Sequence, residues 1–283
     1  MFAGLADRTW FWFAAGFYLL GLLLGTLLLL RGGRGSNATI NVIIALGYIG
    51  QVIGLYTRGR ATGGCPLGNT FEIFQFTAWS AITLYLIVGV RFRSSLLGYF
   101  STCLASVLTL TSLAIPAWDA TRRSKIFGGN PWVELHASLA LFSYGVFALL
   151  ALTAFMLLLR YLSLQRKRLG GWFSFLPPIV ELDHISLRLL ITGVAFMTIA
   201  VFGGTSYWLR EHDPVHASKI VATVAVWLAY SITLVLRWRG HLLAKRFAWT
   251  CILLFFGALL SIGQVDASRR PPAPPAQISV PPR

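Results

Sequence analysis

The stretch WVELHASLALFSYGVFALLALTAFMLLLRYL, from Trp132 to Leu162, is apolar around all sides of a helix and contains few charged residues. About 20 such residues in a helix cross the hydrocarbon core of a bilayer, which is roughly 30 Å thick. A strand of a membrane β-barrel would instead be about ten residues long and would alternate apolar with polar side chains. The stretch therefore predicts a transmembrane helix.

Similar apolar blocks recur along the whole chain, separated by short clusters of Arg, Lys, Gly, Pro and Asp. Hydrophobic residues make up 56% of the 283 positions and charged residues only 12%, whereas a typical soluble domain has about a quarter charged residues. The mean hydropathy is +0.70. We therefore predict an all-α polytopic membrane protein with eight transmembrane helices. The other blocks cover residues 10–30, 40–56, 71–90, 96–117, 187–209, 219–236 and 247–264.

The domain organisation follows from the same composition. We expect one membrane domain over residues 1–265. Residues 266–283 include Pro271-Pro-Ala-Pro-Pro275 and Pro281-Pro282, a composition that stays extended and forms no core. This segment is predicted to be a disordered tail.

The orientation depends on basic residues, which are retained on the cytoplasmic side. Lys and Arg are almost equally divided between the two sides, but the densest clusters, Arg166-Lys-Arg168 and Arg237 to Arg246, follow the fifth and seventh blocks. We expect these clusters in the cytoplasm and both termini outside. The localisation predicted is that of a multi-pass membrane protein.

The net charge of +15 indicates contact with membrane lipid and not with nucleic acid, because the basic residues are scattered at loop ends and form no basic domain. The three cysteines contain no Cys-x-x-Cys pair, which excludes that class of thiol oxidoreductase. Solute transport is the least favoured function, since Asn41, Gln51 and Gln75 are among the few polar groups within the apolar blocks.

Three helix starts are predicted at the outer face. Asn69-Thr-Phe-Glu72 has the spacing of a capping box, and Asn130-Pro131 and Asp213-Pro214 each offer an N-cap followed by proline. A carboxylate such as Glu72 at a membrane-embedded helix start must be capped, paired or functional, and the capping box already accounts for it.

Two histidines, His136 and His216, follow the second and third of these starts. Imidazole there could ligate haem iron; the alternative is a histidine that is hydrogen-bonded at a helix end or interface. Trp132 and Trp208 also lie near outer helix ends. They could flank a macrocycle, although tryptophans are common at membrane interfaces in general.

Three segments together resemble the cytochrome c assembly proteins, a family that includes CcsA-like, HemX-like and YpjD-like membrane proteins. The resemblance covers roughly residues 60–240. The first segment is Gly64-Cys-Pro-Leu-Gly-Asn-Thr-Phe-Glu72 with Trp79, similar to that family's Pro-Leu-x-Asn-x-Tyr-Glu. The others are Asn130-Pro-Trp-Val-Glu-Leu-His136 continuing to Ser143-Tyr144, and Leu176-Pro-Pro178 with Leu182-Asp183 and Arg188, leading to Gly203-Gly204.

The resemblance implies a protein that presents or stabilises haem b at the outer face of a bacterial cytoplasmic membrane during cytochrome c biogenesis. His136 would be an axial ligand and Glu72 part of the adjoining motif. A partner membrane protein would complete the site, apocytochrome c is a further expected partner, and any enzymatic role would be as a subunit of a haem-attachment system. The alternative is a HemX-type regulatory or scaffolding membrane protein that carries no haem.

The sequence departs from the synthase-like members of the family at two places. A tryptophan-rich loop should precede the seventh helix, where this chain has Tyr207-Trp208-Leu-Arg-Glu-His-Asp213-Pro214. A further histidine should occur near the end, where it has Gly263-Gln264-Val265-Asp266. The chain is therefore nearer to the compact HemX-like or YpjD-like branch.

Overall fold

The computed structural model describes residues 2–30, 37–89, 95–120, 130–167, 176, 178–211 and 217–267. These residues form helices and connecting turns, with no strand among them, so the predicted all-α fold is confirmed. The elements are α1 (Phe2–Leu30), α2 (Asn37–Thr62), α3 (Thr70–Leu84), the π-helical turn η1 (Tyr85–Gly89), α4 (Ser95–Ala114), the 3-10 helix η2 (Pro116–Asp119), α5 (Pro131–Gln165), α6 (Ile179–Glu211), α7 (Ala217–Trp238) and α8 (Ala244–Ala267).

Five helices among the described residues contain segments that are long and apolar enough to cross a membrane, and the chain is an all-α membrane protein. The count of eight spans stays a prediction, because α4 contributes only the shorter apolar segment Gly98–Ala114 and the described parts of α3 and α8 contribute none. The five segments are Asp7–Leu28, Ala38–Thr62, Pro131–Gln165, Ile179–Ser206 and Ile220–Trp238.

The helix boundaries differ from the apolar blocks where packing or proline decides them. The helix α6 begins at Ile179 instead of residue 187, because Leu182, Ile185 and Leu189 recur at helical spacing and are buried although polar residues separate them. The helix α4 ends at Ala114 because Pro116 follows, and proline disfavours helical conformation in the residue before it. The predicted tail lies outside the described residues, apart from Asp266 and Ala267 in α8.

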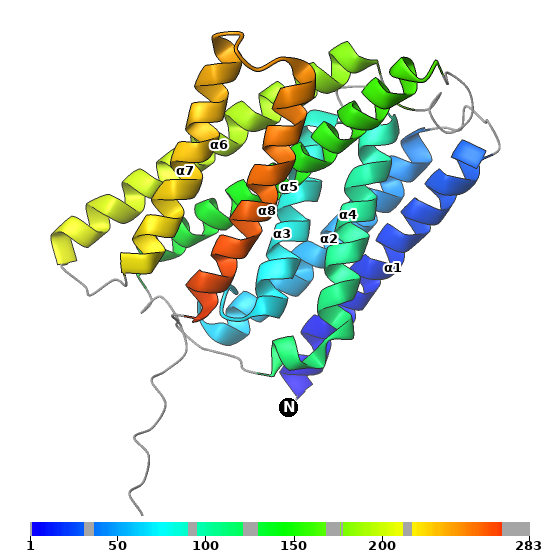
Figure 1. Cartoon of the computed structure of the whole chain (residues 1–283). Helices are drawn as coiled ribbons and strands as arrows, with labels where there is room; N and C mark the ends of the chain where they lie inside the picture. The colour runs from blue at the N-terminus through cyan, green and yellow to red at the C-terminus, as the bar shows by residue number, and fades with distance from the viewer. Residues whose placement is uncertain are drawn as a thin grey trace, which may run out of the picture.

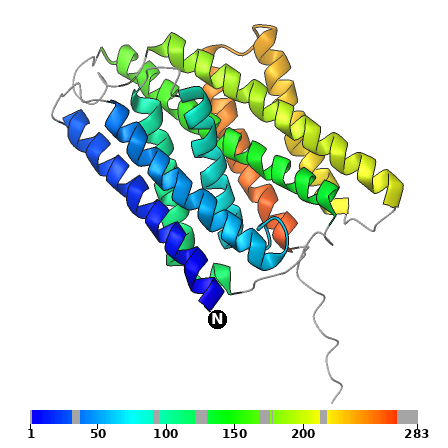
Figure 2. The same ribbon diagram turned by 180° about the vertical axis from the view of Figure 1, so that it is seen from behind.

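Consecutive helices run antiparallel, so alternate helices begin at the same end of the bundle (Figures 1 and 2). The start of α1, the turn between α2 and α3, the element η2 and the start of α5 share one end, which is at the bottom of Figure 1. The last turns of α8 lie there too. We call this the charged end, because Asp7, Arg58, Glu72 and Asp119 lie there.

The helix α5 is the central helix, since 72% of its apolar segment is buried compared with 17% for that of α7. It packs against α6, α8 and α3, while α1 packs against α2 and α4. The ring of Phe147 on α5 stacks on Tyr230 of α7 at 3.7 Å between centroids. The core therefore forms around α5, whose first turns reach the charged end.

A second feature of the interior is a hydrogen-bonded set of polar side chains across α1, α2, α3 and α4. The hydroxyl of Tyr18 donates to Gln51 Oε1 at 2.7 Å. Gln51 Nε2 donates to Gln75 Oε1 at 3.1 Å, and Gln75 Nε2 donates to Ser112 Oγ at 2.8 Å. The glutamines are fully buried, so their polar groups bind one another across the helices, as burial away from water requires.

Candidate functional site at the charged end

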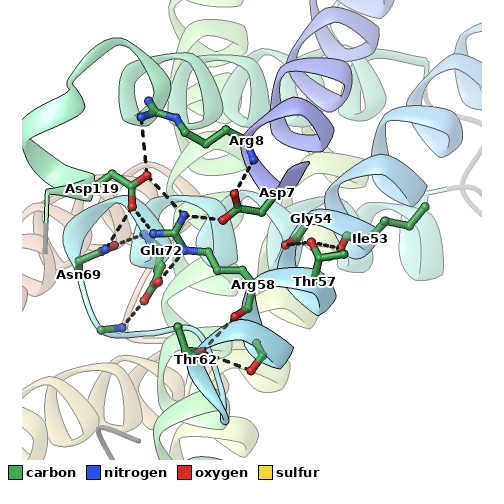
Figure 3. Close-up of polar contacts among 12 residues, drawn as sticks. Asp7, Arg8, Ile53, Gly54, Thr57, Arg58, Thr62, Asn69, Glu72 and Asp119 are labelled. Atoms are coloured by element: carbon green, nitrogen blue, oxygen red, sulfur yellow. Dashed lines mark hydrogen bonds and ion pairs between the residues drawn. The ribbon is translucent and has the colours of Figure 1, made fainter. Parts of the chain in front are cut away.

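The side chain of Arg58, in the last turns of α2, lies at the centre of a buried ion-pair cluster (Figure 3). Its Nε donates to Glu72 Oε1 at 2.6 Å, and its Nη1 donates to Asp7 Oδ2 at 3.0 Å. Its Nη2 donates to Asp119 Oδ1. These carboxylates come from α3, α1 and η2 respectively, so one guanidinium joins four elements.

The electrostatics of the cluster depend on its burial. Arg58 is fully buried, and Asp7, Glu72 and Asp119 are buried with it. A buried charge carries a desolvation penalty of several kcal/mol unless partners compensate it. Arg8, which is partly exposed, places its Nη1 3.7 Å from Asp119 Oδ2. Three carboxylates thus face two guanidinium groups, and the cluster behaves as one structural unit.

The ring of Phe71 closes the apolar side of this cluster. The Arg58 guanidinium carbon lies 4.7 Å from the centroid of the Phe71 ring, which is fully buried. This distance is within the range of a cation–π interaction. Phe71 also packs edge-on against Phe11 of α1 at 5.4 Å. Apolar packing therefore continues directly from the charged cluster into the helix core.

The predicted N-cap of α3 is confirmed. The Glu72 N–H donates to Asn69 Oδ1 at 2.9 Å. A capping box would pair the Glu72 carboxylate with the N–H of Asn69; here Glu72 Oε2 accepts from the N–H of Gly68. The other carboxylate oxygen of Glu72 accepts from Arg58. Glu72 therefore both anchors the turn before α3 and neutralises a buried arginine, and the second role was missed in the sequence.

Substituting Glu72 tests these two roles. In Glu72→Gln the neutral amide oxygen can replace only one of the two contacts, and we expect the free energy of unfolding to fall by about 1.5–3 kcal/mol. In Glu72→Leu both contacts are lost, and we expect a loss of about 3–5 kcal/mol. The measurement is denaturant unfolding of the detergent-purified protein.

The control for this series is Glu181→Gln at the half-exposed start of α6, where a surface substitution should change stability by less than about 0.5 kcal/mol. A Glu72→Gln protein as stable as the wild type would show that capping alone explains this residue.

The first turns of α5 hold the turn between α2 and α3 in place. Asn130 Oδ1 accepts from the Trp132 N–H at 3.0 Å, which confirms the predicted N-cap. Glu134 Oε2 accepts from the Cys65 N–H at 3.3 Å, and Cys65 Sγ lies 3.2 Å from Ser138 Oγ. Burial raises the pKa of the Cys65 thiol, so the thiol stays protonated at neutral pH and is a weak nucleophile.

The imidazole of His136 lies on another face of α5, against α6. Its Nδ1 is 2.5 Å from the carbonyl oxygen of Ala200. A carbonyl can only accept, so Nδ1 carries the proton and Nε2 keeps its lone pair. A histidine that donates Nδ1–H to a backbone carbonyl is held in the tautomer and orientation that metal ligation through Nε2 requires.

Gly204 makes room for this imidazole. A Cβ atom built on Gly204 would lie 2.5 Å from His136 Cε1, which is closer than real Cβ contacts. Only glycine therefore lets α6 approach the ring. Within the family-like segment Gly203-Gly204 this steric requirement applies to Gly204 and not to Gly203, where a Cβ would meet no atom within 4 Å.

This contact leads to a prediction with an internal control. Gly204→Ala should displace the His136 ring and break its hydrogen bond to Ala200, whereas Gly203→Ala should leave the ring in place. The measurement is the imidazole NMR spectrum of selectively labelled His136 in the two variants. Equal spectra for Gly204→Ala and the wild type would contradict the close packing.

The structure describes only some of the other predicted site residues. Trp132 is 72% exposed in the first turn of α5, as expected at a membrane interface. Trp208 belongs to α6, but the position of its side chain is not described, and His216 lies outside the described residues. The structure thus brings His136 and Glu72 to the same end of the bundle and leaves a second histidine ligand as a prediction.

The fold and this site define a class: an all-α membrane protein with a buried ion-pair cluster and an oriented histidine at one end. The chain belongs to the cytochrome c assembly protein family, whose sequence profile matches residues 67–263. This match includes Glu72, His136 and Gly204. Family membership supports a role in cytochrome c biogenesis.

Individual relatives agree with this assignment. Protein HemX of Bacillus subtilis is 26% identical over 189 residues, which cover 62% of this chain and 64% of HemX. The cytochrome c biogenesis protein CcsA of Chlamydomonas reinhardtii is 24% identical over 224 residues, or 73% of this chain and 60% of CcsA. The inner membrane protein YpjD of Escherichia coli is 24% identical over 223 residues, which cover 78% of this chain and 81% of YpjD. The matches therefore span less than two thirds of these HemX and CcsA chains.

Proposed function

We propose that this protein presents or stabilises haem at the outer face of the bacterial cytoplasmic membrane during cytochrome c biogenesis. The observation that carries the proposal is the hydrogen bond from His136 Nδ1–H to Ala200, which leaves the Nε2 lone pair as the one that could ligate iron. Membership of the cytochrome c assembly family supports the role in cytochrome c biogenesis.

The imidazole of His136 fits a ligand of haem iron. When bound, haem b would supply an iron atom that an imidazole nitrogen can ligate. His136 would hold it through Nε2, and His216 is the proposed second ligand. Trp132, and Trp208 on α6, would flank the macrocycle. Glu72 would contribute to the haem site indirectly, through its ion pair with Arg58, because both of its carboxylate oxygens already accept hydrogen bonds.

The partners in this proposal are membrane lipid, a membrane protein of the cytochrome c maturation system and apocytochrome c. The chain lacks the tryptophan-rich segment of synthase-like members before its seventh helix, so a partner completes haem attachment. The second candidate function, a HemX-type regulatory or scaffolding role without haem, is favoured by HemX relatives from both Bacillus subtilis and Brevibacillus brevis.

The role in biogenesis is tested by deleting the gene in the source bacterium. Haem-stained c-type cytochromes should be lost or strongly reduced, while membrane b-type cytochromes remain. The reason is that only c-type cytochromes need haem to be attached covalently. A plasmid copy of the wild-type gene is the control and should restore them. Normal c-type cytochromes in the deletion strain would contradict the proposed role.

The proposed orientation puts the charged end outside, with both termini there. Alkaline phosphatase fused after Ala120, just beyond η2, should be active, and the same reporter fused after Gly240, between α7 and α8, should be inactive. The reverse pattern would put the charged end in the cytoplasm and would remove the outer-face part of the proposal.

A further inference from the structure

A pocket of about 590 Å³ lies between α2 and α3 at the charged end. It is separate from the α5–α6 contact that holds His136. Most of its wall is apolar, and glycines in the last turns of α2 and in the turn after it leave the space open. The lining residues are Val52, Leu55, Tyr56, Gly59, Arg60, Gly63, Gly64, Pro66, Phe76 and Trp79.

The charged side chain that lines the pocket is Arg60. Arg60 is exposed and has no carboxylate partner among the described residues; its Nη1 donates only a long hydrogen bond, 3.5 Å, to the Tyr56 hydroxyl. The Nε1 atom of Trp79 is buried out of reach of an occupant, so Trp79 offers the pocket apolar surface. The pocket therefore suits a ligand that has an anionic group for Arg60 and an apolar chain.

The route into the pocket runs along the lipid-facing side of α2. Val42, Leu46, Ile49, Val52 and Tyr56 recur at helical spacing, and each is at least 38% exposed. This apolar stripe lies within the membrane-spanning segment Ala38–Thr62, and its last two residues line the pocket. An occupant with a long apolar chain can therefore enter sideways from the bilayer.

We propose that this pocket binds one anionic phospholipid. Its phosphate pairs with the Arg60 guanidinium, for which two parallel N–H···O bonds are the favoured geometry. An acyl chain follows the exposed stripe of α2. A zwitterionic lipid binds more weakly, because its own cation competes with Arg60 for the phosphate. This proposal does not depend on haem binding.

The test is native mass spectrometry of the full chain, purified in detergent and titrated with phosphatidylglycerol or with phosphatidylcholine of the same acyl composition. The wild type should bind one phosphatidylglycerol molecule more tightly than phosphatidylcholine. Arg60→Gln should weaken that binding by about tenfold, the value for one lost charge-assisted hydrogen bond.

Two further variants make the test specific. Arg239→Gln, at an exposed arginine after α7, removes the same charge elsewhere and should bind like the wild type. Val52→Trp fills the pocket from its half-exposed wall and should abolish the preference although every charge remains. The proposal is overturned if Arg60→Gln binds like the wild type, if Arg239→Gln weakens binding equally, or if added haemin displaces the lipid from this pocket.

Discussion

Replacing Arg58 by alanine is expected to lower the free energy of unfolding by about 3–5 kcal/mol, because it leaves buried carboxylates without their counter-charge. Three acidic side chains, those of Asp7, Glu72 and Asp119, would then face one another in the core. Partly exposed Arg8 would still pair with Asp119. Denaturant unfolding in detergent micelles is the measurement, with recovery of monomer after extraction as a second one.

The matched control is Arg60→Ala, two residues later on the same helix, where the arginine is exposed and has no carboxylate partner among the described residues. Its effect on stability should be below about 0.5 kcal/mol. The loss of stability in Asp7→Asn should lie between those of Arg58→Ala and Arg60→Ala, because Arg58 keeps its bonds to Glu72 and Asp119. If Arg58→Ala and Arg60→Ala were equally stable, the cluster would have no structural role.

The second large effect concerns His136. His136→Ala should remove the Soret absorbance of haem from the purified protein, because the variant lacks the oriented Nε2 while its helices remain packed. Added imidazole should restore part of the spectrum by occupying the vacated axial position. His184→Ala is the control, since His184 is exposed at the other end of α6 and should be dispensable for the spectrum.

His216→Ala is a companion to this test, at the proposed second ligand. If the wild type copurifies with haem, and neither His136→Ala nor His216→Ala changes its spectrum, the ligand assignment is wrong. The haem would then be held by other residues or by a partner chain.

The helices were predictable because each depends on a continuous apolar run, and burial of such runs dominates a membrane fold. The N-caps at Asn69 and Asn130 were also predictable, because a cap is a contact within four residues. The early start of α6 was not, because its buried face is interrupted by polar residues and depends on packing against α5.

The ion-pair cluster could not be read from the sequence, because its members are separated by up to 112 positions, from Asp7 to Asp119, and converge only in the folded chain. Arg58 follows an apolar block and resembles an ordinary loop-end cation. One signal was present: the chain has only 9 acidic residues, so those near one membrane boundary were candidates for pairing with a nearby arginine.

The position of the cluster also explains how the N-terminal helices join the rest of the protein. The family profile begins at residue 67, so Asp7 and Arg58 precede it, whereas Glu72 and Asp119 lie within it. Arg58 therefore links α1 and α2 to the region shared with the family. The charged end that would present haem thus depends on residues outside the family match.

The absorbance spectrum of the wild-type chain, purified in detergent from a haem-sufficient host, tests the central claim most directly. Our account predicts a Soret band that is lost in His136→Ala, when both proteins are recovered as folded monomers in equal yield. A folded wild-type protein without a Soret band would contradict haem binding by this chain, and would favour the regulatory or scaffolding function instead.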